Sequence, residues 1–193
     1  MKIRKAEKKD ARFLAKTVIS AIGEDICADF AGGNERLPLI YELFEGLAER
    51  DDSQYSYTNA FIAEENDQAI GAIIGYDGAR LRSLRSTFVT LANEILGMAM
   101  TDEEFAERGD EADSDEFYLD SLFVESEYRN RGIGSELIRY SVEANKNSGK
   151  PMGLLVEPEN LNAKRLYEKL GFMAVGENAF FGAPMIHMQL TPP

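Results

Sequence analysis

A glycine-rich turn after Val124 constrains the fold of this chain more than any other feature of its sequence. The apolar run over residues 117–124 is typical of a strand. Gly132 and Gly134 follow within ten residues. Four apolar residues then recur at the spacing of one helix face: Ile133, Leu137, Ile138 and Val142. The sequence therefore predicts a strand that runs through a glycine turn directly into the N-terminus of a helix.

Such a turn is suited to binding an anion. The first N–H groups of a helix have no partner within the helix, the helix dipole lies behind them, and glycines let a phosphate approach the backbone. A dinucleotide fingerprint would need a small residue where Leu137 stands, and the Gly-Lys-Ser/Thr of a P-loop is absent. From the turn alone, an ordinary strand-to-helix connection with solvated arginines remains the alternative.

The rest of the chain alternates between predicted strands and helices, as in an α/β or α+β sheet protein. Its length fits one domain, residues 1–193. Asp10 stands where an N-cap would open the first helix, and Gly23 ends that helix. Strands are expected at residues 1–6, 59–64, 69–76, 117–124, 152–156, 172–181 and 185–190, and helices at 10–22, 37–47, 79–100, 133–147 and 160–170.

A second motif lies one predicted strand after the turn. It runs from Asn160 to Phe172 and reads Asn-x-x-Ala-x-x-Leu-Tyr-Glu-Lys-Leu-Gly-Phe. Asn160 can cap a helix, and Gly171 is suited to end it. This motif, after Leu-Phe-Val and Arg-x-x-Gly-x-Gly, resembles the GNAT superfamily of acyl-CoA-dependent N-acetyltransferases. The resemblance covers about residues 117–172 well, and the first half only by the order of its elements.

The resemblance implies a single N-acetyltransferase domain with a central, mostly antiparallel mixed sheet, a splayed strand pair and flanking helices. The coenzyme-binding core would be residues 117–172. Residues 23–56 and 79–116 would supply the acceptor-side helices and an acidic insertion. Acetyl-CoA is the implied cosubstrate, and its pantetheine arm would lie in the gap of the splayed pair. The implied coenzyme contacts are Leu122, Phe123, Val124, Arg129, Asn130, Arg131, Gly132, Ile133, Gly134, Ser135, Asn160 and Tyr167.

Acyl transfer to an amine needs a proton acceptor, a donor to the oxyanion and a proton for the departing thiolate. Similarity to the family points to Tyr167 for the thiolate; the alternative is a core aromatic. Some family members carry a Glu at the position of Tyr118, which is not a carboxylate here. We therefore expect Asp120 first and Glu116 second as the base, unless Asp120 is structural and bulk water takes the proton. The backbone N–H of Val124 is our candidate oxyanion donor.

The charge balance narrows the partners. The chain has 21 Lys and Arg against 34 Asp and Glu, a net charge of −13. This charge disfavours nucleic acid and anionic membrane surfaces and favours a cationic partner. The acidic run over residues 102–116 reads either as a solvated face or as a lip that attracts amines. His187, the only histidine, fits packing in the last strand better than catalysis, and no metal is expected.

These observations predict an N-acetyltransferase that is monomeric or homodimeric. We expect it to be cytoplasmic, because no signal peptide or spanning segment is evident. It would move an acetyl group from acetyl-CoA to a primary amine by direct attack in a ternary complex, with a small cationic amine as the expected acceptor. The alternatives are a non-catalytic acyl-CoA-binding or regulatory module and an acetyltransferase that acts on a protein N-terminus or a lysine.

Overall fold

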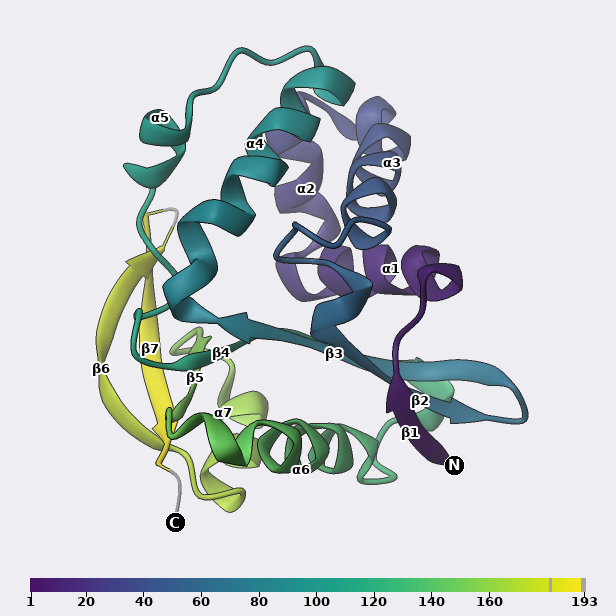
Figure 1. The fold of residues 1–193 in the computed structure, drawn as a ribbon, viewed down its shortest axis with the longest axis vertical. Coiled ribbons are helices and arrows are strands. Elements are labelled where there is room, and N and C mark those ends of the chain that lie inside the picture. Colours follow the sequence, from purple (N-terminus) through teal and green to yellow (C-terminus); the bar gives the residue numbers. More distant parts are fainter. Residues whose placement is uncertain (181, 192–193) are drawn as a thin grey trace.

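The computed structural model describes residues 1–180 and 182–191 and contains one twisted sheet (Figure 1). Within these residues the sheet has seven strands in the order β1-β2-β3-β4-β5-β7-β6. Every neighbouring pair is antiparallel except β4 and β5, which are parallel. The strands are β1 (Lys2–Lys5), β2 (Ala60–Glu65), β3 (Gln68–Asp77), β4 (Phe117–Val124), β5 (Met152–Val156), β6 (Met173–Phe180) and β7 (Ala183–Leu190).

Helices cover both faces of this sheet (Figure 1). One face, here called the upper face as in Figure 1, is covered by α1 (Ala11–Ile22), α2 (Glu24–Ala31), α3 (Leu37–Ala48) and α4 (Leu81–Leu96). The short helix α5 (Asp102–Ala106) follows α4 on the same side. The opposite, lower face is covered by α6 (Ile133–Asn145) and α7 (Leu161–Lys169). The molecule thus has three layers, with the sheet in the middle.

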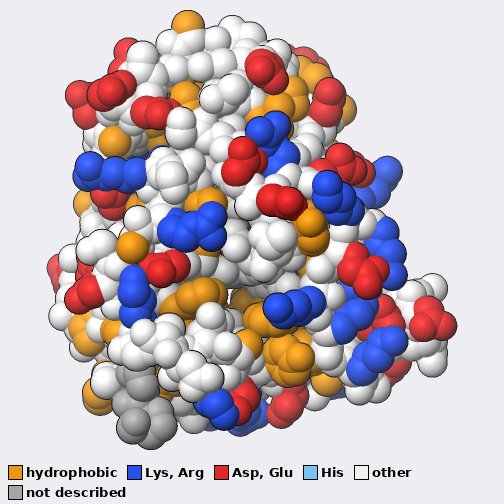
Figure 2. All heavy atoms as spheres, viewed as in Figure 1, with side chains coloured by type: hydrophobic (Ala, Val, Ile, Leu, Met, Phe, Trp, Pro, Cys, Tyr) orange, Lys and Arg blue, Asp and Glu red, His pale blue; other side chains and the backbone are white. Residues whose placement is uncertain are grey.

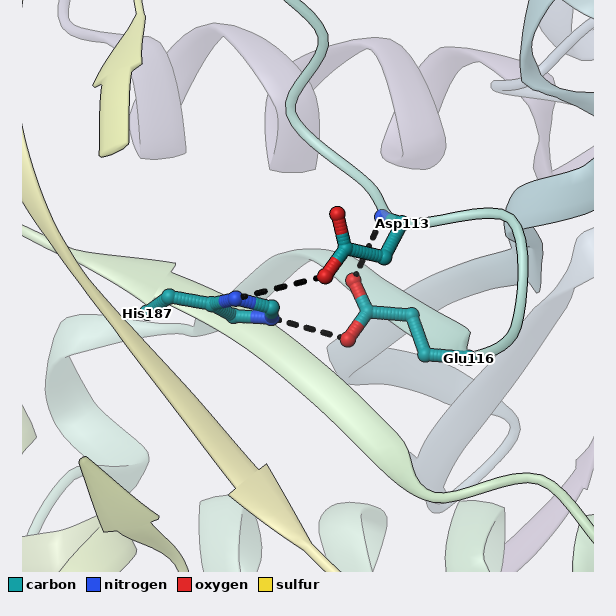
Figure 3. Close-up of side chains that lie close together, drawn as sticks. All are labelled: Asp113, Glu116 and His187. Atoms are coloured by element: carbon teal, nitrogen blue, oxygen red, sulfur yellow. Dashed lines mark hydrogen bonds and ion pairs between the residues drawn. The ribbon is translucent and has the colours of Figure 1, made fainter. Parts of the chain in front are cut away.

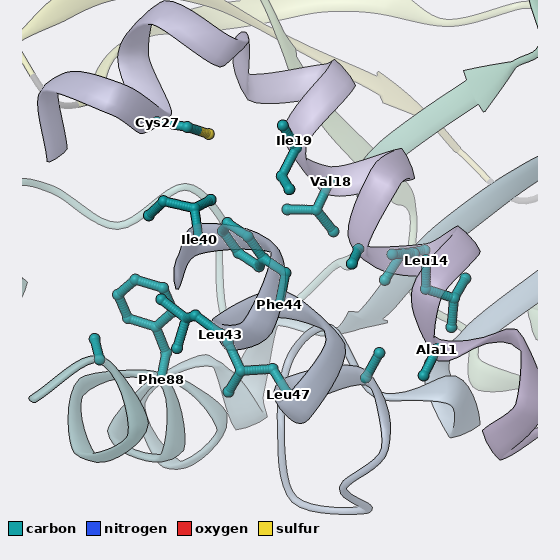
Figure 4. Close-up of a cluster of buried hydrophobic side chains, with 14 of the residues drawn as sticks. Ala11, Leu14, Val18, Ile19, Cys27, Ile40, Leu43, Phe44, Leu47 and Phe88 are labelled. Atoms are coloured by element: carbon teal, nitrogen blue, oxygen red, sulfur yellow. The ribbon is translucent and has the colours of Figure 1, made fainter. Parts of the chain in front are cut away.

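The upper core is built from the amphipathic helices of the first half (Figure 4). In α3, buried Ile40, Leu43, Phe44 and Leu47 recur at the spacing of one helix face. Phe44 packs near Phe88 of α4, with ring centroids 6.2 Å apart. Cys27 of α2 lies in the same core, and burial raises the pKa of its thiol to about 11. This cysteine packs as a small apolar side chain.

The parallel pair is the irregular part of the sheet. β4 and β5 pair only at Phe117 with Met152 and at Tyr118 with Gly153. Both strands then continue, β4 to Val124 and β5 to Val156, without further pairing between them. The splayed strand pair expected from the resemblance is therefore present. The fold class is also confirmed: the domain is mixed α/β with a mostly antiparallel sheet.

Most predicted elements are confirmed, and residues 117–124 and 152–156 match their strands residue for residue. Two short helices, α2 and α5, are absent from the prediction. Asp10 does precede α1, but its carboxylate accepts hydrogen bonds from Arg4 (2.7 Å) and from the Glu7 N–H (2.8 Å) instead of from the helix. In the part of the chain described here, no helix has the length and apolar character needed to cross a membrane.

Candidate active site

Asp120 lies in a β-bulge where β4 leaves β5. On the β3 side, Ile74 pairs with Ser121 and Gly75 pairs with Leu119, so Asp120 is the extra residue. Leu119 packs into the lower core with α6, whereas Tyr118 packs beside Tyr76 and α4 on the upper face. The bulge interrupts the alternation of side chains, and the Asp120 carboxylate approaches Tyr76 on the upper face. Asp120 thus lies on the same face as Tyr118, two residues earlier.

The surroundings of Asp120 favour its protonated form. Burial raises the pKa of Asp120 to about 7; the hydrogen bond from Ser121 lowers it, and the negative charge of Glu111 raises it. Ser121 Oγ donates to Asp120 Oδ1 at 2.6 Å, and the Tyr76 hydroxyl oxygen lies 3.5 Å from Oδ2. A carboxyl group with a pKa near neutrality is suited to accept a proton at physiological pH.

Tyr167 lies on the opposite side of the sheet. It belongs to α7 and packs in the lower core with Phe172, with ring centroids 5.9 Å apart. Burial raises the pKa of its hydroxyl, which therefore keeps its proton at neutral pH. The first two predicted catalytic residues thus flank the sheet from opposite faces, beside the strands that separate.

Glu116 is fully buried and joins three segments (Figure 3). Its carboxylate accepts hydrogen bonds from the Asp113 N–H (3.0 Å) and from Gln189 Nε2 (2.8 Å), and lies 2.8 Å from His187 Nε2. It also covers Gly153, where an added Cβ would fall 1.8 Å from Glu116 Oε2. With these partners, Glu116 ties the end of the acidic segment to β5 and β7. This structural role weakens its case as a base.

His187 does more than pack in the last strand, because it is a polar partner of Glu116. Its Nδ1 lies 3.8 Å from Asp113 Oδ2, on the other side of the ring (Figure 3). In the described residues, ligand atoms of Asp113, Glu116 and His187 all lie within 4.8 Å of one another. A divalent metal would have to replace the proton between His187 and Glu116, so hydrogen bonding is the simpler explanation of this group.

The glycine turn has the predicted geometry. Asn130 (φ 60°) and Gly132 (φ 79°) are in the left-handed region, and Gly132 is the N-cap of α6. Ile133 is buried in the lower core and fixes the helix start. At Gly134, an added Cβ would lie 3.7 Å from Leu122, an ordinary contact distance. The packing of the protein itself therefore does not require glycine at this position.

Other predicted coenzyme residues surround this turn. Arg129 Nε donates to the Val124 carbonyl at 3.0 Å, and Arg131 pairs with Glu65 at 3.3 Å. Asn160 Oδ1 accepts from the Ala163 N–H at 3.1 Å, which confirms that it caps α7. Two other predicted coenzyme residues lie on opposite faces of the sheet: Leu122 contacts the lower core, and Phe123 packs on Phe13 of the upper face. Ser135 is partly buried in the first turn of α6.

The acidic segment is packed on its C-terminal side. Phe105 joins the upper core, and both Glu111 and Glu116 are buried. Arg85 of α4 forms ion pairs with Asp110 (2.8 Å) and Glu111. Glu111 and Glu116 are therefore not part of a solvated face, whereas residues 102–104 and 113–115 are exposed. Figure 2 shows Lys and Arg interspersed with Asp and Glu over the viewed face, so that face is not uniformly acidic.

Four polar residues near Asp120 were not predicted from the sequence: Gln54, Tyr76, Arg85 and Glu111. Glu111 Oε1 accepts from Tyr76 at 2.8 Å and from Gln54 at 3.2 Å. These partners are 35 and 57 residues away along the chain, respectively. No local pattern connects them, and only the fold brings them together.

Comparison with known proteins identifies the family. The family model described as "Acetyltransferase (GNAT) family" matches residues 21–172. A curated relative, the uncharacterized N-acetyltransferase YobR of Bacillus subtilis (strain 168), is 40% identical over 63 residues. That match covers 32% of this chain and only 26% of the relative.

Solved structures share the fold along the whole chain. One described as an acetyltransferase has a TM-score of 0.80 and 25% identity, with 100% of both chains covered. YncA of Salmonella typhimurium, described as a putative acetyltransferase with its cofactor acetyl-CoA, has a TM-score of 0.58 and 17% identity, covering 100% of this chain and 94% of its own. The family match and the shared fold indicate an acyltransferase. The chain belongs to the GNAT acetyltransferase family.

The contact between Glu116 and Gly153 gives a test of the site's architecture. Gly153→Ala should destabilise the protein by about 2 kcal/mol or more, because the new methyl group would overlap a buried carboxylate. Gly176→Ala is the matched control, since it is also in a strand and a Cβ there meets nothing within 4 Å. Thermal and urea unfolding measure both variants. Equal effects of the two substitutions would contradict the described position of Glu116.

Proposed function

We propose that this protein transfers an acetyl group from acetyl-CoA to a primary amine by direct attack in a ternary complex. Family membership supports acetyl transfer. The observation that carries the proposal is the separation of β4 from β5 beyond Tyr118 and Gly153, with Asp120 on one face of the sheet and Tyr167 on the other. This arrangement allows a thioester between the strands to meet the acceptor from above and a proton donor from below.

Acetyl-CoA would bind along the glycine turn and the free edge of β4. The pyrophosphate would contact the first N–H groups of α6, between Arg129 and Ser135. Gly134, which packing alone does not require, would let it approach closely. The pantetheine arm would pair with the edge of β4 at residues 122–124, as an added strand does. A structural neighbour, YncA, is described with acetyl-CoA as its cofactor.

The reaction would begin with an amine that loses its proton to Asp120. The neutral nitrogen attacks the thioester carbonyl and forms a tetrahedral oxyanion. The Val124 N–H is positioned to stabilise it, because the N–H of Glu125 bonds to Ile70 of β3 and neighbouring N–H groups of a strand point to opposite sides. As the C–S bond breaks, Tyr167 donates its proton to the thiolate. The attacking nitrogen releases a proton to solvent, and the proton on Tyr167 is replaced from solvent. The products are an amide and free coenzyme A.

The acceptor would enter from the upper face, where Asp120 lies. A small cationic amine is our preferred class, because the chain carries a net charge of −13. Buried Glu111 and Glu116 have their own partners and would contribute little to this attraction. The acceptor would therefore be drawn mainly by exposed carboxylates such as those of residues 102–104.

A panel of amines tests the activity. Purified protein with acetyl-CoA should release free thiol on addition of at least one amine, and mass spectrometry should find that amine heavier by one acetyl group. The panel would include alkylamines, polyamines, lysine and peptides with free N-termini. Tight acetyl-CoA binding without turnover on any acceptor would contradict the proposal and indicate a non-catalytic module.

Tyr167→Phe tests the proton donor. Loss of the hydroxyl should lower kcat on the order of 10²-fold, because the thiolate must leave without its acid. The affinity for acetyl-CoA, measured by calorimetry, should not change, since the ring still packs against Phe172. Tyr140→Phe, an exposed tyrosine of α6, serves as the control. An unchanged kcat in Tyr167→Phe would remove this residue from the mechanism.

Asp120→Asn tests the base through pH. In the wild type, kcat/KM should rise with pH through about 7 as Asp120 ionises, and this limb should disappear in the variant.

The stability of the wild type should change in the opposite direction, so that its free energy of unfolding falls as the pH rises. The folded state retains a proton between pH 4 and 7 that the unfolded state loses, so ionisation of Asp120 destabilises the fold as pH rises.

The neutral amide avoids this loss of stability. The melting temperature of Asp120→Asn, relative to wild type, should therefore be higher at pH 8 than at pH 5. A variant that is inactive, yet stabilised most at high pH, fits a catalytic carboxylate. A variant destabilised equally at both pH values would indicate a structural Asp120.

A further inference from the structure

A buried chain of polar groups leads from the acidic segment to Asp120. Glu111, between α5 and β4, has only 4% of its side chain exposed, and so has Arg85. Arg85 forms an ion pair with one carboxylate oxygen of Glu111. The other oxygen accepts the Tyr76 hydroxyl at 2.8 Å. Glu111 therefore faces Tyr76 as a carboxylate.

Tyr76 connects this ion pair to Asp120. Its hydroxyl oxygen lies 2.8 Å from Glu111 Oε1 and 3.5 Å from Asp120 Oδ2. A phenol has a single proton, and the shorter contact, to a charged acceptor, takes it. Tyr76 then presents lone pairs to Asp120, and these can only accept a proton from it. An acceptor in this position favours the protonated form of Asp120.

Other groups face Asp120 from each neighbouring element. Tyr118 of β4 and Tyr55 of the segment between α3 and β2 are buried phenols, and burial raises their pKa well above the ordinary value, so they remain neutral. Ser121 donates to Asp120 and opposes the effect of Tyr76. Glu111 contributes the negative charge in this group, and Arg85 lies on its far side.

We propose that Glu111, held by Arg85, acts through Tyr76 as a positioning residue for Asp120, so that the acidic segment completes the active site. This inference rests on the proposed function, in which Asp120 is the base. It assigns the segment a role different from attracting the acceptor. The segment is anchored for that role, since the Asp110 carbonyl accepts from Asn178 of β6 at 3.0 Å and Phe105 packs in the upper core.

Glu111→Gln tests the inference by removing the charge while keeping the shape. The Tyr76 proton would become available to Asp120 and favour its ionised form. The midpoint of the acidic limb of kcat/KM should fall by about one pH unit or more, and kcat at pH 8 should fall with it. The KM for acetyl-CoA should stay unchanged, because the partners of Glu111 are Gln54, Tyr76 and Arg85, and none of these is expected to hold the coenzyme. Glu143→Gln, the same change at an exposed position near the C-terminal end of α6, should move neither the midpoint nor kcat.

A second readout follows Asp120 without using activity. The melting temperature of Asp120→Asn should be compared with that of its otherwise identical parent protein at a series of pH values. The difference should change over the pH range, or window, in which Asp120 of the parent protein loses its proton. In the Glu111→Gln background this window should move to lower pH. If neither the window nor the rate profile moves, Glu111 is not coupled to Asp120 and the inference is overturned. If the window moves while the rate profile does not, Asp120 is not the base, and the positioning role falls with the proposed function.

Tyr76→Phe provides an independent variant should Glu111→Gln fail to fold. It removes only the hydroxyl that links the two carboxyl groups. Because Asp120 would lose an acceptor, the midpoint of its limb should fall here too. A rise would mean that Tyr76 donates to Asp120, and an unchanged midpoint would mean that it does not act on Asp120; either result overturns the inference.

Discussion

The two residue pairs that join β4 to β5 hold the structure together. They are the direct strand contact between the first four strands and the last three. Glu116, one residue before β4, reinforces the junction by bonding to β7 across Gly153. Because this end is clamped, the other ends of the strands can separate without splitting the sheet. The opening in which we propose the coenzyme arm to lie is thus a consequence of where the pairing stops.

The order of elements in the second half could be predicted because the relevant information is local. The strand before the glycine turn, the helix after it and the capped helix beginning at Asn160 each carry their signal within about a dozen residues. The helix α2 escaped prediction because only three of its eight residues are buried, leaving a weak periodic signal. The burial of Glu111 could not be predicted, because the composition of the acidic segment suits solvent and the partner of Glu111, Arg85, belongs to a different helix.

The site was predictable only in part, for the same physical reason. Tyr167 belongs to a motif and Asp120 to the strand before the glycine turn, and the structure places them on opposite faces of the sheet. The pKa of Asp120 is raised by burial and by the negative charge of Glu111, which Tyr76 separates from it, and these groups come together only after the sheet and the acidic segment have folded. His187 likewise gains a role from Glu116, 71 residues away. The position of the Asp120 side chain also depends on a β-bulge, which no residue in the sequence predicts.

The two faces of the sheet also differ in their freedom to change. Most groups expected to hold the coenzyme lie in the turn, on β4 or on the lower face. The partners of Asp120 outside β4 come from segments between residues 54 and 111 on the upper face. Substitutions above the sheet can therefore reshape what is modified while the donor side stays intact. During evolution, we expect the parts that hold the coenzyme to stay constant while the segments above the sheet vary. New acceptors would be acquired through the first 116 residues, with the motifs of the second half preserved.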